Sequence, residues 1–194
     1  SGQPGEQEAE SEREKQADEA RVAMTPMTHA LGIAGERTAV YDYVRALLAH
    51  FAVFHAPMDA RLFVLAAQEQ AWAWTEQLQH CQSDSETEYR FFLDKNKPDP
   101  EKKAPFDEVE ETPLMRYLEG LRRILATRKI QLESREDQEG KGDPTLPFQL
   151  VVIDLLDSAY DEQSPLYDLE SDAAISILIE QGAALGAAVI FLVP

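Results

Sequence analysis

The chain has 194 residues, of which 44% are hydrophobic, so it can bury a core and one domain is the expected organisation. A net charge of −18, from 36 acidic and 18 basic residues, disfavours binding of the whole surface to nucleic acid or to anionic membranes. A single cysteine, Cys81, excludes an internal disulfide and a cysteine-built zinc site. Since neither a membrane-spanning apolar run nor the apolar region of a signal peptide is present, we expect a soluble fragment from a reducing compartment.

Charged segments divide the chain. Residues 1–25 are an acidic leader, expected to be disordered or loosely helical because it has little apolar surface to bury. A start inside such a leader suggests a piece of a longer protein. Residues 26–194 are expected to form a single α/β domain with a polar insert near 82–112, where ten acids and five bases occur. A further loop, broken by Gly and Pro, is expected over 134–147.

Apolar runs alternate with helical patterns along the domain. Strands are expected over 30–34, 61–66, 89–93, 148–154 and 187–193. Helices are expected over 36–54, 68–79, 113–135 and 168–185. Apolar strands separated by helices predict an α/β fold, with a mostly parallel sheet of about five strands covered on both faces in three layers.

The helix expected over 113–135 is net basic, and its outer face is expected to carry Arg122, Arg123 and Arg128. This face is either a solvated surface that offsets acidic neighbours or a docking face for an acidic partner or a nucleotide phosphate. On the helix before it, Trp72 and Trp74 are two positions apart and point to different sides. Core filling by both is one interpretation; the other makes one of them an anchor for a partner. The candidate partner-binding residues are Trp72, Trp74, Arg122 and Arg123.

The run Leu150-Val-Val-Ile-Asp154 has the pattern of a Walker B strand. Such a strand carries a carboxylate to the C-terminal edge of the sheet, where it holds the magnesium shell. The alternative is an ordinary loop carboxylate at a strand end. In ATPases of the additional-strand type a glutamate usually follows this aspartate to activate water, whereas here Leu155 follows and Asp157 comes two positions later.

The first strand is not followed by a phosphate loop of the form Gly-x-x-x-x-Gly-Lys-Ser/Thr. The equivalent stretch from Ala34 to Val40 has one glycine and no lysine, and Glu36 would repel phosphate. ATP hydrolysis, catalytic residues and a bound metal are therefore not expected. Under the alternative of an atypical phosphate loop, ATP and magnesium would be the cofactors, bound by Gly35, Arg37, Thr38 and Asp154.

The remaining reactive side chains are expected to be structural. His50 and His55 are five positions apart, which departs from the i, i+4 spacing of a metal pair. His55 stands at a helix end, where an imidazole can cap carbonyl groups. Cys81 has none of the sequence surroundings of a catalytic thiol.

Residues 44–65 and 71–80 resemble the FtsK/SpoIIIE-type motor proteins of type VII secretion, the EccC class. The match includes a His-Ala-Pro-x-Asp turn at 55–59, an arginine that opens a strand at 61, and a Trp-x-Trp helix that ends at His80. Gln79 stands where that family often has proline. The resemblance covers roughly 36–82 and, more loosely, 150–194.

This resemblance implies a degenerate RecA-like module that precedes tandem ATPase domains at the cytoplasmic face of the plasma membrane. Such a module would connect or transmit conformational state rather than hydrolyse ATP. Its partners would be neighbouring domains of the motor and other secretion-complex subunits, without direct membrane insertion. An ATP-binding domain and a DNA-translocase domain remain alternatives, although the net charge of −18 opposes binding to nucleic acid.

Overall fold

The computed structural model describes residues 29–83, 87–96, 112–136, 146–158 and 161–194. The predicted leader 1–25, most of the insert near 82–112 and most of the 134–147 loop lie outside the described residues. With η for a 3-10 helix, the elements in chain order are β1 (Ala30–Ala34), α2 (Arg37–Phe54), β2 (Ala60–Ala66), η1 (Gln70–Gln77), η2 (Gln79–Cys81), β3 (Arg90–Phe92), α3 (Pro113–Glu136), β4 (Phe148–Asp154), η3 (Leu169–Ser171), α4 (Ala173–Gln181) and β5 (Ala187–Val193).

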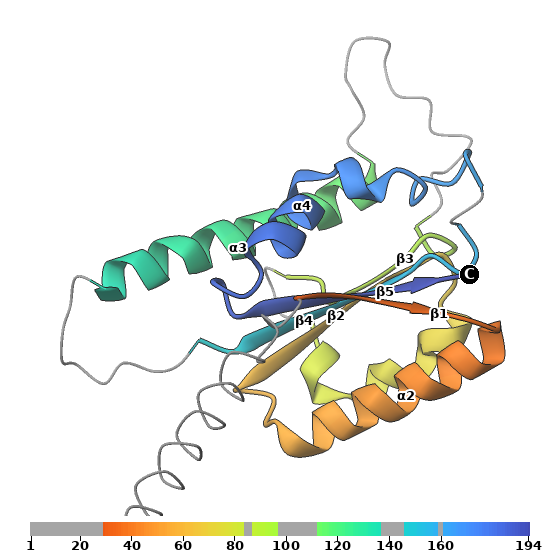
Figure 1. Ribbon diagram of the computed structural model, residues 1–194, viewed down its shortest axis with the longest axis horizontal. Coiled ribbons are helices and arrows are strands. Elements are labelled where there is room, and N and C mark those ends of the chain that lie inside the picture. The colour runs from red at the N-terminus through yellow and green to blue at the C-terminus, as the bar shows by residue number, and fades with distance from the viewer. Residues whose placement is uncertain (1–28, 84–86, 97–111, 137–145, 159–160) are drawn as a thin grey trace, which may run out of the picture.

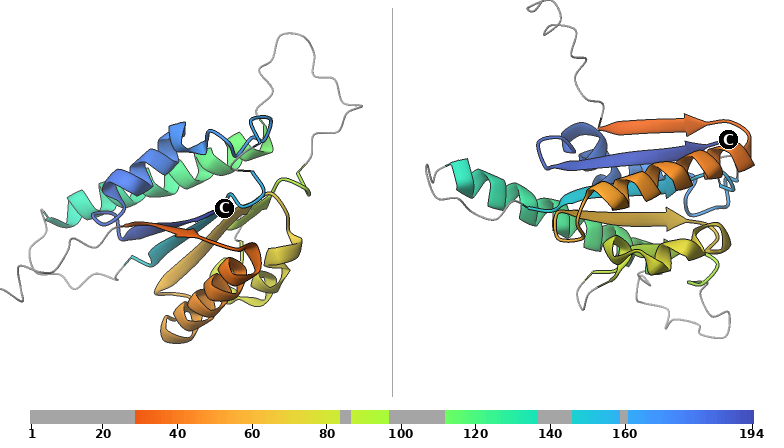
Figure 2. Two further views of the ribbon diagram at one scale, coloured as in Figure 1. Left: turned by 45° about the vertical axis from the view of Figure 1, so that its right-hand side comes forward. Right: turned by 90° about the horizontal axis from the view of Figure 1, so that it is seen from below.

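The five strands form one sheet in the order β1-β5-β4-β2-β3, and every neighbouring pair is parallel. Helices α3 and α4 cover one face, and α2 lies on the other (Figure 1; Figure 2). This confirms the predicted α/β fold class, in a three-layer arrangement consistent with the RecA-like type. One strand, β5, separates β1 from β4. None of the described helices is long and apolar enough to cross a membrane.

The core consists of two apolar clusters, one on each face of the sheet. Side chains of β4 alternate between them: Val151 and Ile153 face α3 and α4, whereas Leu150 and Val152 pack with α2 and η1. The same alternation directs Asp154, the last residue of β4, toward the side of α2. The strand pattern therefore decides which helix layer meets this carboxylate.

Two of the predicted helices differ from what is observed. The segment predicted as a helix over 68–79 forms the 3-10 helices η1 and η2, interrupted at Leu78, which has an extended backbone. In η1 the Thr75 hydroxyl donates to the Trp72 carbonyl at 2.6 Å, so a side chain shares an acceptor of the tight turn. The helix predicted over 168–185 shortens to α4, because Asp172 caps its start by accepting from Ala174 N at 2.7 Å.

The prediction of a basic outer face on α3 is wrong at Arg128, which is only 5% exposed. Its guanidinium donates to the carbonyls of Leu185 and Pro147, each at 2.7 Å, and to that of Gly186 at 3.3 Å. Gly186 has φ +60°, and a Cβ there would lie 2.9 Å from the Arg128 Nη2 atom. Arg128 thus ties α3 to the segments that lead into β4 and β5.

We expect Arg128→Met to lower the free energy of unfolding by about 2–4 kcal/mol, because buried carbonyl groups lose their donor. Denaturation in urea measures this loss. The matched control is Arg123→Met on the exposed side of the same helix, where a change within about 0.5 kcal/mol is expected. Equal losses in the two variants would contradict the role given to Arg128.

Candidate functional site

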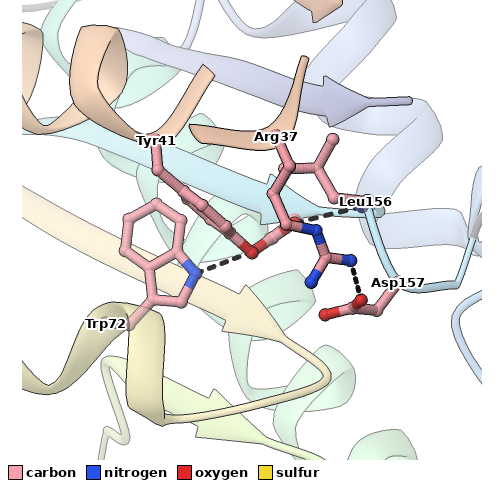
Figure 3. A network of polar contacts seen from close by, with 6 residues as sticks. Arg37, Tyr41, Trp72, Leu156 and Asp157 are labelled. Carbon is pink, nitrogen blue, oxygen red and sulfur yellow. Dashed lines mark hydrogen bonds and ion pairs between the residues drawn. The ribbon is translucent and has the colours of Figure 1, made fainter. Parts of the chain in front are cut away.

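The candidate site lies at the carboxyl edge of the sheet, where β1 and β4 end (Figure 3). Ligands of open parallel sheets bind at this edge, because the loops that follow the strands converge there. The residues after β1 begin α2, and those after β4 form a turn that starts at Leu155. Two polar groupings occupy the edge, one around Asp154 and one around Arg37.

Both carboxylate oxygens of Asp154 are engaged by groups of the protein, and the residue is 4% exposed. Its Oδ2 atom accepts from the Tyr41 hydroxyl and from Trp72 Nε1, each at 2.8 Å. Its Oδ1 atom accepts from Leu156 N at 3.1 Å. The Tyr41 and Trp72 rings meet edge to face with centroids 6.3 Å apart. Three segments distant in sequence thus supply the donors that a buried carboxylate needs.

The surroundings of Tyr41 keep its hydroxyl group protonated, so that it can donate a hydrogen bond. Burial raises the pKa of the Tyr41 phenol above its ordinary value, and the negative charge of Asp154 raises it further. The phenol therefore stays protonated through the physiological range and can continue to donate to Asp154. A charged carboxylate is held by two neutral aromatic donors and one backbone N–H.

The turn between β1 and α2 consists of two residues, Gly35 and Glu36. Gly35 has φ +152°, a conformation that side chains disfavour. Glu36 is the N-cap of α2, and its carboxylate accepts from Ala39 N at 3.0 Å. Backbone hydrogen bonds from Thr38 and Ala39 lower the pKa of Glu36. A carboxylate of the chain itself thus takes the helix N-terminus, where a phosphate would otherwise be attracted.

Arg37 begins α2, and its guanidinium pairs with the Asp157 carboxylate in the turn after β4. Half of the Arg37 side chain is exposed, so the pair is partly screened by solvent. Together with the Tyr41 bond, it is the second link between the start of α2 and the end of β4 (Figure 3).

The structure brings the candidate nucleotide-binding residues to one edge of the sheet. Gly35, Arg37 and Thr38 lie in or just after the β1–α2 turn, and Asp154 ends β4. Two of these residues, Arg37 and Asp154, already have polar partners within the chain. Nucleotide binding by this set remains a prediction.

The candidate partner-binding residues do not form one surface. Trp72 is 2% exposed and belongs to the core on the side of α2, where Trp74 packs against the same cluster. Arg122 and Arg123 are exposed on α3, across the sheet. Arg122 donates to both carboxylate oxygens of Glu119, at 2.7 and 2.8 Å. Both tryptophans therefore pack on the side of α2, Trp72 buried and Trp74 partly buried, whereas the spacing predicted that they would point to different sides.

Sequence reasoning missed Tyr41. One signal could have indicated it: a buried aspartate at a strand end requires donors, and Tyr41 lies one turn after Arg37 in the helix that follows β1. The crossing of α2 over β4 decides whether Tyr41 reaches Asp154, and that geometry cannot be obtained from spacing.

The residues of the His-Ala-Pro-x-Asp turn lie at the end of α2, away from this site. His55 Nδ1 donates to the Phe51 carbonyl at 2.9 Å, which confirms the predicted cap. His80 is buried, and its Nε2 donates to the His55 carbonyl at 2.8 Å. Burial raises the pKa of the Cys81 thiol to about 12, which is unsuited to a nucleophile. Among the described residues no cluster of three or more histidine, cysteine, aspartate or glutamate side chains could hold a metal.

Comparison with known proteins gives one informative match. No family model matches the sequence, and no solved structure matches it. Among curated proteins, the chain is 30% identical over 139 residues to the ESX secretion system protein EccC of Thermomonospora curvata. The match covers 66% of this chain and 8% of that relative. The chain is thus similar to one small part of EccC, in agreement with the resemblance seen in the sequence.

We expect Asp154→Ala to lower the free energy of unfolding by about 2–4 kcal/mol, because the Tyr41 hydroxyl and the Trp72 indole lose a charged acceptor. Asp157→Ala, in the turn that follows, removes only the partly exposed pair with Arg37. This variant should lower the free energy of unfolding by less than about 1 kcal/mol. Denaturant titration of both variants measures the difference. A larger loss in Asp157→Ala would be inconsistent with the assigned roles.

Tyr41 should titrate above an ordinary tyrosine, because its pKa is raised in the folded protein. The stability that this group contributes is fully present below about pH 10 and is lost as the pH rises through the folded-state value. The difference in ultraviolet absorbance between the wild type and Tyr41→Phe follows this titration. In Asp154→Asn the Tyr41 phenol should ionise at lower pH, since one of the two causes is removed; an unchanged titration would exclude the charge of Asp154 as a cause.

Proposed function

We propose that this chain is a non-hydrolysing α/β module of an EccC-like secretion motor. The observation that carries the proposal is the double engagement of Asp154 Oδ2 by Tyr41 and Trp72. The chain spans 8% of the curated relative that it matches. Under this proposal, any ATPase activity of such a motor belongs to its other parts. The module connects these parts or transmits their conformational state.

The burial and the hydrogen bonds of Asp154 favour a structural role for this residue. A Walker B carboxylate must offer an oxygen to the coordination shell of magnesium in a site that nucleotide can enter. Here the carboxylate is 4% exposed and accepts from three donors. Freeing Oδ2 requires breaking two charge-assisted hydrogen bonds, at about 1.5–3 kcal/mol each. Magnesium would have to compensate for this loss without the support of a phosphate loop.

The β1–α2 turn favours the same conclusion. A phosphate loop needs several residues to wrap their N–H groups around the β-phosphate, and only Gly35 and Glu36 lie between β1 and α2. The Glu36 carboxylate stands at the helix N-terminus and would repel a triphosphate. Under this proposal, the pair of Arg37 and Asp157 joins α2 to β4.

The partners proposed for the module are neighbouring domains of the motor and other subunits of the secretion complex, at the cytoplasmic face of the plasma membrane. An atypical ATP site is the second candidate, because Gly35, Arg37, Thr38 and Asp154 lie at one edge. Nucleic acid is not a proposed partner, since the net charge is −18.

Calorimetry with ATP and magnesium tests the proposal. We expect no heat of binding and no rise in melting temperature at millimolar ATP, because a ligand stabilises only a fold that it binds. Arg37→Ala should behave like Arg45→Ala, a control that removes an exposed arginine further along α2. Micromolar ATP binding that is lost in Arg37→Ala and kept in Arg45→Ala would replace the proposal with the atypical nucleotide site.

A further inference from the structure

The sheet has an open edge at β1. In the order β1-β5-β4-β2-β3, no strand of the described residues lies beyond β1 (Figure 2). The His29 carbonyl accepts from Val189 N of β5 at 2.7 Å. Because successive residues of a strand turn their backbone groups to opposite sides, Leu31 and Ile33 also face β5. The N–H and C=O groups of the alternate residues therefore point away from the sheet: Ala30, Gly32 and Ala34.

The strand β1 lacks the features that usually protect an edge strand from further pairing, which are short length, charged side chains, proline and bulges. The opposite edge strand, β3, has three residues and begins with Arg90. In contrast, β1 has five uncharged residues without proline. Its register with β5 runs unbroken from Ala30↔Val189 to Ala34↔Val193. Nothing in β1 itself therefore obstructs the addition of another strand.

Gly32 lies in the middle of this edge, where the fold of the chain does not require glycine. A Cβ added there would meet no atom of the described residues within 4 Å beyond its chain neighbours, and its φ is not positive. Glycine weakens a strand, and it marks a bulge, a tight bend or the close approach of another molecule. The regular pairing with β5 excludes the bulge and the bend. The close approach of another molecule is the remaining explanation.

Exposed apolar side chains flank the edge on both faces of the sheet. Leu31 is 45% exposed and lies on the α2 face by the alternation of the strand, so Gly32 faces the layer of α4. Ile179 of α4 is 42% exposed. It shares a side of the helix with Gly182, where an added Cβ would lie 3.3 Å from the His29 Cβ. This side of α4 therefore faces β1.

We propose that β1 binds an extended segment of a different protein as a further strand of the sheet. The backbone of the segment pairs with the outward N–H and C=O groups, which is the recognition mode of β-augmentation. An aromatic side chain of the segment covers Gly32 and contacts Ile179, because a cross-strand aromatic residue compensates for glycine at an edge. A basic residue of the segment lies beside Glu36, which is exposed at the carboxyl end of β1.

The chemistry of the edge distinguishes this partner from two alternatives. A second copy of this chain offers its own β1, which has no aromatic residue, and it approaches against a net charge of −18. Residues 1–28, which precede β1, contain seven acidic residues and no phenylalanine, tyrosine or tryptophan. A separate protein is therefore the expected source. This inference goes beyond the proposed function and does not rest on it.

Selection from a phage-displayed library of random peptides of about nine residues tests the proposal, with the full 194-residue chain as bait. We expect the enriched peptides to alternate apolar residues, with an aromatic residue near the middle and a basic residue near one end. They should bind the wild type at least about tenfold more tightly than Gly32→Pro, which removes an outward N–H donor.

Proline is tolerated where the N–H of an edge strand faces solvent, so Gly32→Pro should keep the circular dichroism of the wild type. Ala30→Pro, at the first residue of β1, is a second variant of the same kind and should also weaken binding. The control is Phe54→Ser on α2, where the side chain is 70% exposed. This variant should bind the peptides as the wild type does.

Amide hydrogen exchange locates the contact. A saturating enriched peptide should slow exchange at the Gly32 and Ala34 amides by at least about tenfold, whereas the Leu31 and Ile33 amides, which face β5, should change less. Failure to enrich peptides that prefer the wild type to Gly32→Pro overturns the proposal, as does binding lost in Phe54→Ser. Protection of the Gly32 amide without peptide also overturns it. At every protein concentration such protection assigns the edge to another part of this chain, and only at high concentration to a second copy.

Discussion

The carboxylate of Asp154 is the constraint around which the carboxyl edge of this protein is organised. A charged group that is 4% exposed is tolerated only where hydrogen-bond donors replace water. The donors are Tyr41 from α2, Trp72 from η1 and the backbone of the turn after β4. Loss of any of them leaves the negative charge partly uncompensated, so the positions of these three segments depend on one another.

This constraint also accounts for features that look unrelated in the sequence. The tight 3-10 geometry of η1 holds the Trp72 indole over the end of β4. The two-residue turn after β1 starts α2 early enough for Tyr41, one turn inside the helix, to reach the same oxygen. The pair of Arg37 and Asp157 forms a further link between α2 and the turn after β4. The protein's own side chains thus bridge part of the edge at which open α/β sheets bind ligands.

Much of this architecture could be predicted, because apolar periodicity reports directly which residues are buried. The limits of β1, β4 and β5 follow from their apolar runs, and α2 and α3 from their 3.6-residue stripes. Helical spacing alone places Arg128 on the buried side, three residues after Leu125 and four before Leu132, and it is assigned to the outer face only because an arginine is ordinarily exposed. Tyr41 could not be placed, because its hydroxyl meets Asp154 only through the crossing of two elements far apart in sequence. Polar contacts between distant segments depend on angles that no local pattern encodes.

The residues on which the resemblance to the EccC class rests lie at two places, the end of α2 and the carboxyl edge of the sheet. At the end of α2, before the chain enters β2, His55 Nδ1 donates to the Phe51 carbonyl and His80 Nε2 donates to the His55 carbonyl. Trp72, in the Trp-x-Trp segment, reaches the carboxyl edge and donates to Asp154. Its indole needs an acceptor in the core, and a carboxylate at the end of β4 supplies one. Asp154 at the end of the Walker-B-like strand and Trp72 are therefore two halves of one structural contact.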